Sequence, residues 1–141
     1  MASTIYNAFK SELMKGSFNL TSDTIKIALV SSSYSPNIDS HVFFSDVTNE
    51  VSASGSYSAG GGTLANKTVT QDNTDDEGVF DADDISFTSA TITARGAVVY
   101  KSTGTASTSR LICYIDFGTD VVSTAGTFAI VFNSEGIVNI N

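Results

Sequence analysis

The sequence predicts a single, mainly β domain over residues 1–141, an antiparallel β-sandwich or barrel with one short helix at its N-terminus. Helical periodicity is confined to the first residues of the chain. Short runs of β-branched and aromatic residues follow at spacings of about ten residues, with no helices between them. One proline is present, so the turns must depend on Gly, Ser, Asn and Asp. No shift in composition and no internal repeat marks a second domain.

The N-terminal helix is predicted over residues 1–16, ahead of the β-rich part at 17–141. Its apolar residues recur every four positions and would form one stripe, consisting of Ile5, Phe9 and Leu13. Ser3 or Thr4 is expected to cap the start of the helix, because a hydroxyl oxygen can accept a free backbone N–H there. Gly16 suits the left-handed conformation just past the end.

The strands are predicted from six runs, at 24–32, 84–93, 96–102, 110–118, 126–134 and 136–141. The first run alternates, with Ile25, Ile27 and Leu29 on one face and Ala28 and Val30 on the other. The stretch 31–62 is the least regular part of the chain, and 43–51 within it is expected to form a helical turn. We expect one or both of the N-terminal helix and this excursion to contact neighbouring molecules or the shell of a larger assembly, because a sandwich core needs them least. The alternative is that the helix only covers an open end of the sandwich.

The stretch GGTLANKT, residues 61–68, resembles a phosphate-binding loop in which Asn66 replaces the second glycine. A working loop of this kind follows a buried strand and opens a helix, whose N-terminal amides hold the phosphate. Here a strand-like sequence follows Lys67, and a Gly- and Ser-rich stretch precedes Gly61. The segment is therefore predicted to be a glycine-built turn that leads into a strand.

The stretch 72–84 carries seven acidic residues in thirteen positions. Calcium prefers six to eight hard oxygen ligands, so the stretch is a weak candidate for a cation site, with Asp75, Glu77, Asp81 and Asp84 as candidate ligands. An EF-hand is not expected, because the last ligand is not Glu and no helices flank the loop. The favoured interpretation is a solvated acidic loop between two strands that binds no metal.

Charge and catalytic residues narrow the function classes. Fifteen acidic residues against seven scattered basic residues give a net charge of −8, which argues against binding to nucleic acid or to an anionic membrane. The single cysteine, Cys113, excludes an intrachain disulfide and is expected to be a buried hydrophobe. His41 has no partners that would make a catalytic constellation. With no signal sequence, the chain is expected in a reducing cytoplasm, as a non-enzyme without cofactors.

The order of several stretches resembles a family of small virion proteins of tailed bacteriophages: FNLTSDTIKIALVSSSYSPN, SGSYSAGGGTLANKTVT, FDADDISFTSATITARGAVVYK, RLICYIDFG and GTFAIVFNSEGIVNI. The resemblance implies a jelly-roll-like β-sandwich and a capsid decoration (cement) protein that stabilises the shell. Its implied partners are the major capsid protein and two further copies in a homo-trimer, and its implied location is the virion, assembled in the bacterial host cytoplasm. A tail or neck protein of the virion and a sugar-binding β-sandwich module are the alternatives.

The C-terminal runs are apolar on both faces, which predicts burial on both sides. Phe128, Ile130 and Phe132 would share one face, and Ala129 and Val131 the other. Since a short chain can cover only part of this surface, the remainder is expected to pack against a sister subunit or the shell. The residues predicted at interfaces are Ile5, Phe9, Leu13, Phe132, Ile137 and Ile140.

Overall fold

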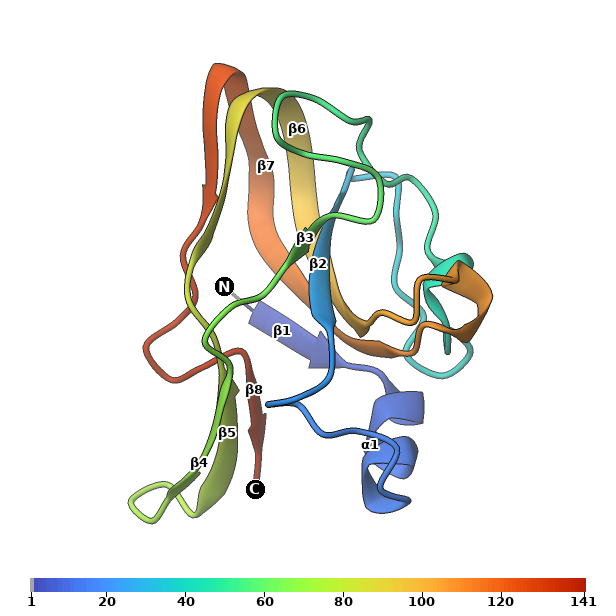
Figure 1. The fold of residues 1–141 in the computed structure, drawn as a ribbon, viewed down its shortest axis with the longest axis vertical. Helices are drawn as coiled ribbons and strands as arrows, with labels where there is room; N and C mark the ends of the chain where they lie inside the picture. The colour runs from blue at the N-terminus through green and yellow to red at the C-terminus, as the bar shows by residue number, and fades with distance from the viewer. Residues whose placement is uncertain (1) are drawn as a thin grey trace.

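The computed structural model describes residues 2–141 and is mainly β, with one short α-helix and antiparallel strand pairing (Figure 1). A five-stranded sheet has the order β1-β7-β6-β2-β3, and a three-stranded sheet has the order β4-β5-β8. The elements are β1 (Ala2–Ile5), α1 (Asn7–Met14), β2 (Ile25–Val30), η1 (Phe44–Asp46), β3 (Gly62–Thr63), β4 (Thr68–Asp72), β5 (Glu77–Asp81), β6 (Ile85–Lys101), η2 (Ala106–Thr108), β7 (Leu111–Ile130) and β8 (Val138–Ile140).

A long ribbon formed by β6 and β7 runs through the whole molecule. The two strands pair from Tyr100↔Leu111 to Ile85↔Ile130. Between Ala94 and Gly96 the register shifts, and the bulge bends the ribbon without ending it. Figure 1 shows the ribbon rising from the five-stranded sheet, turning over at the top and descending towards the three-stranded sheet. Four of the six predicted strands are therefore halves of two long ones.

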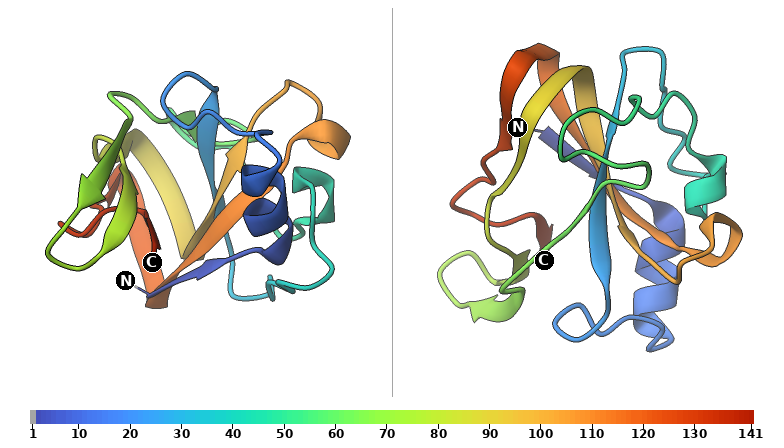
Figure 2. Two further views of the ribbon diagram at one scale, coloured as in Figure 1. Left: turned by 90° about the horizontal axis from the view of Figure 1, so that it is seen from below. Right: turned by 45° about the horizontal axis from the view of Figure 1, so that its top comes forward.

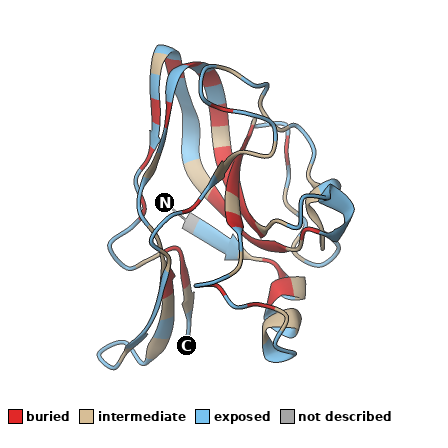
Figure 3. Ribbon diagram, viewed as in Figure 1, coloured by how far each residue is buried: buried red, intermediate tan, exposed pale blue. Residues whose placement is uncertain are grey.

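The main core lies on one face of the five-stranded sheet (Figure 3). Ile25, Ile27 and Leu29 of β2 are fully buried in it, and Phe80 and Val138 of the three-stranded sheet belong to the same apolar cluster. The alternation predicted for β2 is confirmed, because its remaining apolar residues enter a second cluster on the opposite face. β2 therefore has apolar contacts on both sides.

The second core is covered by the excursion between β2 and β3. Tyr34, Ile38, Phe44 and Val47 pack there against the outer face of the five-stranded sheet. The ring of Phe44 stacks on Tyr100 with centroids 4.2 Å apart and planes 9° from parallel. The expected helical turn is the 3₁₀ turn η1. The expectation that the core needs this segment least is wrong, because it buries a sheet face that would otherwise be apolar and exposed.

The structure differs from the prediction over residues 2–6. Instead of a helix from residue 1, the chain forms β1, in which Ile5 pairs with Cys113 at the edge of the five-stranded sheet. The helix begins after Tyr6, which makes no side-chain capping bond, so the capping role expected for Ser3 or Thr4 is also wrong. Gly16 adopts a φ of +80° just past the helix, as predicted. Ile5 packs on the same core as Phe9 and Leu13, although it lies in β1 and not in the helix. The four-residue spacing of the three residues therefore suggested a helix that started too early.

The stretch 72–84 is also more ordered than predicted. β5 lies inside it, and β4 and β5 form a hairpin closed by a tight turn in which Asp76 has a φ of +57°. Val69, Phe80 and Val138 are register partners and share one face of the three-stranded sheet. At this level Phe80 and Val138 reach the main core, whereas Val69 remains exposed. The hairpin extends beyond the core at the lower end of Figure 1.

Candidate functional site

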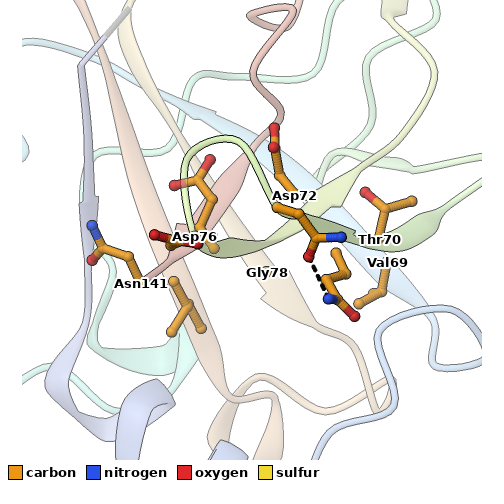
Figure 4. Close-up of a pocket in the computed structure, with 10 residues that line it drawn as sticks. Val69, Thr70, Asp72, Asp76, Gly78 and Asn141 are labelled. Carbon is orange, nitrogen blue, oxygen red and sulfur yellow. Dashed lines mark hydrogen bonds between the residues drawn. The ribbon is translucent and has the colours of Figure 1, made fainter.

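An open groove of about 590 Å³ lies on the three-stranded sheet, and we call it the acidic groove (Figure 4). Gly78 of the central strand pairs with Gln71 on one side and Ile140 on the other. Because Gly78 has no side chain, the surface is hollow between its neighbours. Val69 and Ile140 supply exposed apolar surface, at 54% and 42% exposure. Asp72, Asp76 and Glu77 border the groove. The register places the side chains of Asp72 and Glu77 on the opposite face of the sheet from Val69, Gly78 and Ile140, and Glu77 accepts a hydrogen bond there from Asn139.

Two of the four candidate metal ligands come together at this turn. Carboxylate oxygens of Asp75 and Glu77 lie with one of Asp72 within 4.8 Å of one another. Asp72 Oδ1 already accepts the backbone N–H of Thr74 at 2.8 Å, and Glu77 Oε1 accepts Asn139 Nδ2 at 2.5 Å. Calcium prefers six to eight oxygen ligands. The three carboxylates here are exposed or half-buried, and two of them already accept hydrogen bonds, so they supply too few free oxygens for a tight calcium site.

The other two candidate ligands lie elsewhere. Asp84 Oδ1 accepts the backbone N–H of Phe132 at 2.9 Å and so ties the end of β7 to the start of β6. Asp81 ends β5, and its Oδ1 is buried without a hydrogen-bond partner among the described residues. The structure therefore divides the predicted set of ligands between three places. The stretch was expected to be a loop, whereas the extended strand β5 carries Asp81 and Asp84 away from Asp75 and Glu77 at the turn.

The phosphate-loop look-alike is a turn followed by a strand, as predicted. Gly61 has a φ of +80°, and a Cβ at this position would lie 1.8 Å from the carbonyl oxygen of Ile27. Asn66 Nδ2 donates to Asp83 at 2.6 Å, and Thr68 begins β4 rather than a helix. The glycine is therefore needed for the close approach to β2, and no helix N-terminus faces the segment.

His41 and the buried tyrosines form a structural network. The backbone N–H of Asn37 donates to His41 Nδ1 at 3.2 Å, so the Tyr34 hydroxyl donates to the same nitrogen at 3.0 Å. The Tyr6 hydroxyl lies 2.8 Å from that of Tyr34. Burial, followed by the hydrogen bond to Tyr34, raises the pKa of Tyr6 far above its usual value. This network satisfies polar groups beneath the excursion.

Cys113 is completely buried, as expected. Loss of solvation raises the pKa of its thiol to about 12. The thiolate is the reactive form of cysteine, so this side chain behaves as a small hydrophobe of the core.

Most of the predicted interface residues are used inside the molecule. Phe9, Phe132 and Ile137 belong to the main core, with Ile5 and Leu13 half-buried against it. These five residues leave little free apolar surface, and of the six Ile140 alone is classed as exposed.

The C-terminal part of β7 is buried on one face rather than two. Phe128 and Ile130 point into the core, whereas Val131 is 64% exposed. Val131 lines a hollow of about 200 Å³, which we call the ribbon hollow. All the residues that line it are apolar: Phe117, Val121, Phe128, Ala129, Ile130 and Val131. The predicted apolarity of both faces is thus real, but in the single chain the outer face is open to solvent.

The exposed apolar residues that the sequence did not single out include Met14, Val69 and Val122. Their signal in the sequence is weak, because single exposed apolar residues are common on protein surfaces. Their position beside a groove or a charged face makes them candidates for contacts with other molecules.

Comparison of the chain with protein-family models, curated proteins and solved structures finds no match. Within residues 2–141, α1 and the other helical segments are too short to cross a membrane.

Proposed function

We propose that this protein is a non-enzymatic virion protein of a tailed bacteriophage, a capsid decoration protein that binds the assembled shell and stabilises it. The major capsid protein is its partner, and the protein acts as a homo-trimer. Neither a cofactor nor nucleic acid takes part. The protein is assembled in the host cytoplasm and remains in the virion.

The observation that carries this proposal is exposed apolar surface outside a well-formed core. The ribbon hollow is lined by apolar residues, with Val131 at 64% exposure. The acidic groove adds Val69 and Ile140 on another sheet. Apolar patches of this kind, bordered by polar residues, are typical of surfaces that bind other proteins. The sequence resemblance to virion proteins gives these surfaces a specific kind of partner.

For the fold, we propose that the two sheets and the bent ribbon form a jelly-roll-like sandwich. The main core supports this arrangement, because it combines side chains from both sheets, such as Ile27 of β2 and Phe80 of β5. The bend of the β6–β7 ribbon brings two halves of the same strand pair to opposite sides of this core (Figure 2).

The ribbon hollow is the surface we assign to the shell. Five of its six lining residues belong to β7, which pairs with β6, and Val131 follows directly after β7. Most of the hollow is therefore held by a hydrogen-bonded strand. It contains no charged residue, so binding there removes no charge from water. A capsid site that presents one apolar side chain could fill it.

The proposal is tested by adding the purified protein to phage heads that lack it and measuring co-sedimentation. We expect saturable binding and heads that better resist heat and low salt. Val131→Glu places a charge in the ribbon hollow and should weaken binding at least tenfold. Val122→Glu is the matched control, since Val122 is 62% exposed on the same strand pair but does not line the hollow. Labelled protein found on tails instead of heads would contradict the assignment to the shell.

A further inference from the structure

β4 is an exposed edge strand of the three-stranded sheet. Its inner side pairs with β5 through all five of its residues, Thr68–Asp72, and no bulge interrupts the register. Within residues 2–141 no strand lies on its outer side, and no other segment forms a backbone hydrogen bond with it there. It is the longest of the edge strands in the two sheets. It also lacks proline and lysine, which commonly keep edge strands from pairing with other chains.

One end of this edge carries a positive charge. Lys67 directly precedes β4, and it takes part in none of the ion pairs formed within residues 2–141. The pairing with the β5 side continues before β4, because the backbone N–H of Asp83 donates to the carbonyl oxygen of Ala65 at 3.0 Å. Strand alternation therefore places Lys67 on the same face of the sheet as Val69.

The other end of the edge is acidic on that same face. Asp76, in the turn after β4, lines the acidic groove together with Val69, Gln71 and Asn73 (Figure 4). The side chain of Gln71 donates a hydrogen bond to that of Asn73, so both lie on this face. β4 therefore has a positive charge before its first residue and a negative charge after its last.

We propose that β4 pairs antiparallel with β4 of a second copy of the same chain, across a two-fold axis at Thr70. The two three-stranded sheets then form one continuous sheet. Antiparallel pairing sets Lys67 of each copy opposite Asn73 of the other and close to its Asp76. The edge is thus complementary to itself, as a two-fold contact requires. This contact goes beyond the proposed function, because it is separate from any three-fold association.

A register centred on Thr70 pairs every residue of the strand. Thr70 then faces Thr70 of the second copy, and the hydroxyl of Thr68 faces the carboxylate of Asp72. On the other face Val69 lies opposite Gln71, and the two Val69 side chains are diagonal neighbours across the axis, about 7–8 Å apart. Val69 is 54% exposed in the single chain, so the pairing covers apolar surface. No two like charges are directly opposed.

Backbone hydrogen bonds supply most of the attraction, as they do when a peptide strand is added to a sheet edge. The contact of two short strands is smaller than the interfaces of stable dimers. The charged groups at the strand ends are exposed enough to be screened by salt. We therefore expect a weak self-association that becomes weaker as the salt concentration rises.

Cysteine cross-linking tests the register with the full-length protein alone. Thr70→Cys puts two thiols opposite each other at the axis, so mild oxidation should link most chains into covalent dimers. Thr68→Cys is the matched control, since Thr68 is exposed on the same face of the same strand. Its two thiols would lie about 14 Å apart along the strands, beyond the reach of a disulfide. A mixture of Thr68→Cys and Asp72→Cys should cross-link between the two variants. The buried Cys113 gives the wild-type baseline.

Charge substitutions at the strand ends, followed by sedimentation velocity over a concentration series, test the orientation. Lys67→Glu places a negative charge beside the acidic turn, and Asn73→Lys places a positive charge opposite Lys67. Each variant alone should associate about tenfold more weakly, because the change acts twice in a two-fold contact. An equimolar mixture should recover, because the two new charges face each other in the mixed pair. Lys10→Glu, which makes the same charge change on α1, should leave association unchanged.

Circular dichroism and the melting temperature establish that every variant is folded. Equal cross-linking of Thr70→Cys and Thr68→Cys, or none of either, would overturn the proposal, as would a charge mixture that does not recover. If the cysteine variants stay unlinked and Lys67→Glu loses binding to heads, the partner of β4 is the shell and the two-fold contact is wrong. Cross-linking needs no capsids, so heads that are never bound would end the capsid role and leave the strand pairing intact.

Discussion

The five-stranded sheet has apolar side chains packed on both faces, whereas the three-stranded sheet is covered on part of one face. In β6 the contrast occurs within a single strand. Residues 96–100 are all buried, because alternate side chains enter the main and the second core. Residues 86–94 alternate between buried and exposed except at Thr88 and Ser89, where the register shifts and both residues are exposed. Burial of apolar side chains therefore stabilises the region around β2 most. The β4–β5 hairpin contributes little to the core, so its surface is free to bind a partner.

Matched glycine substitutions should show the largest contrast between the two sheets. At Gly61 an added Cβ would overlap the Ile27 carbonyl at 1.8 Å, and the φ of +80° disfavours any other residue. Gly61→Ala should cost more than about 4 kcal/mol of unfolding free energy or prevent folding. At Gly78 the nearest atom would be 3.9 Å away, so Gly78→Ala should change stability by less than about 0.5 kcal/mol. Urea unfolding measures both, and equal losses would contradict the comparison.

Truncation of an apolar side chain in each sheet should give the next largest difference. Ile27 is fully buried in β2, so Ile27→Ala should cost about 2–5 kcal/mol through lost transfer energy and the remaining cavity. Val69 is 54% exposed in β4, and Val69→Ala should cost less than about 0.5 kcal/mol. Chemical denaturation with unchanged m-values checks both. A large loss at Val69 would show that the hairpin belongs to the stabilising core.

The segment that covers the five-stranded sheet should make stability depend on pH through Asp46. Backbone N–H groups of Phe43 and then Val42 donate to Asp46 and lower its pKa below the ordinary 3.8. Because the folded pKa is the lower one, the stabilisation is complete above the ordinary value and is lost as pH falls through the folded pKa. Asp46→Asn should cost about 1 kcal/mol near neutral pH. Urea titrations should show this difference shrinking below about pH 4, and a constant difference would contradict it.

Calcium should have the smallest effect, and only the hairpin could respond to it. A tight site at 100 times its dissociation constant would add about 2.7 kcal/mol. The carboxylates of Asp72 and Glu77 already accept hydrogen bonds, so we expect the melting temperature to rise by less than about 2 °C. A larger rise that disappears in the Asp75→Asn, Glu77→Asn double variant would show that the turn holds a cation.

Strands with a clear apolar pattern could be predicted from the sequence. β2 was recognised with the correct faces, because its alternation reflects two apolar surfaces that both need cover. Two errors in the predicted strands and helix had physical causes. Bulges such as the one near Gly96 keep strands continuous across a break in the pattern. Ile5 matched a helical spacing although its neighbours pair with β7, since pairing with a distant strand leaves no local signal.

The candidate surfaces were harder to predict. Phe132 and Ile137 were expected at an interface because they are apolar, yet the molecule's own core buries them. Val131 was grouped with an apolar face correctly, but its exposure depends on which side of β7 the rest of the chain covers. The acidic groove depends on Gly78 lying between Gln71 and Ile140. That juxtaposition is set by strand register, which sequence patterns alone do not specify.

The pairing of β1 with β7 also has a consequence for the order of events during synthesis. β1 pairs with residues 113–116, so this strand leaves the ribosome about a hundred residues before its partner. The β6–β7 ribbon is joined by the short connection between Lys101 and Leu111 and can zip up locally. Closing short loops costs less entropy, so this ribbon should pair before β1 joins it. Nascent chains would then carry an unpaired N-terminal strand, which a neighbouring copy on the same message could capture.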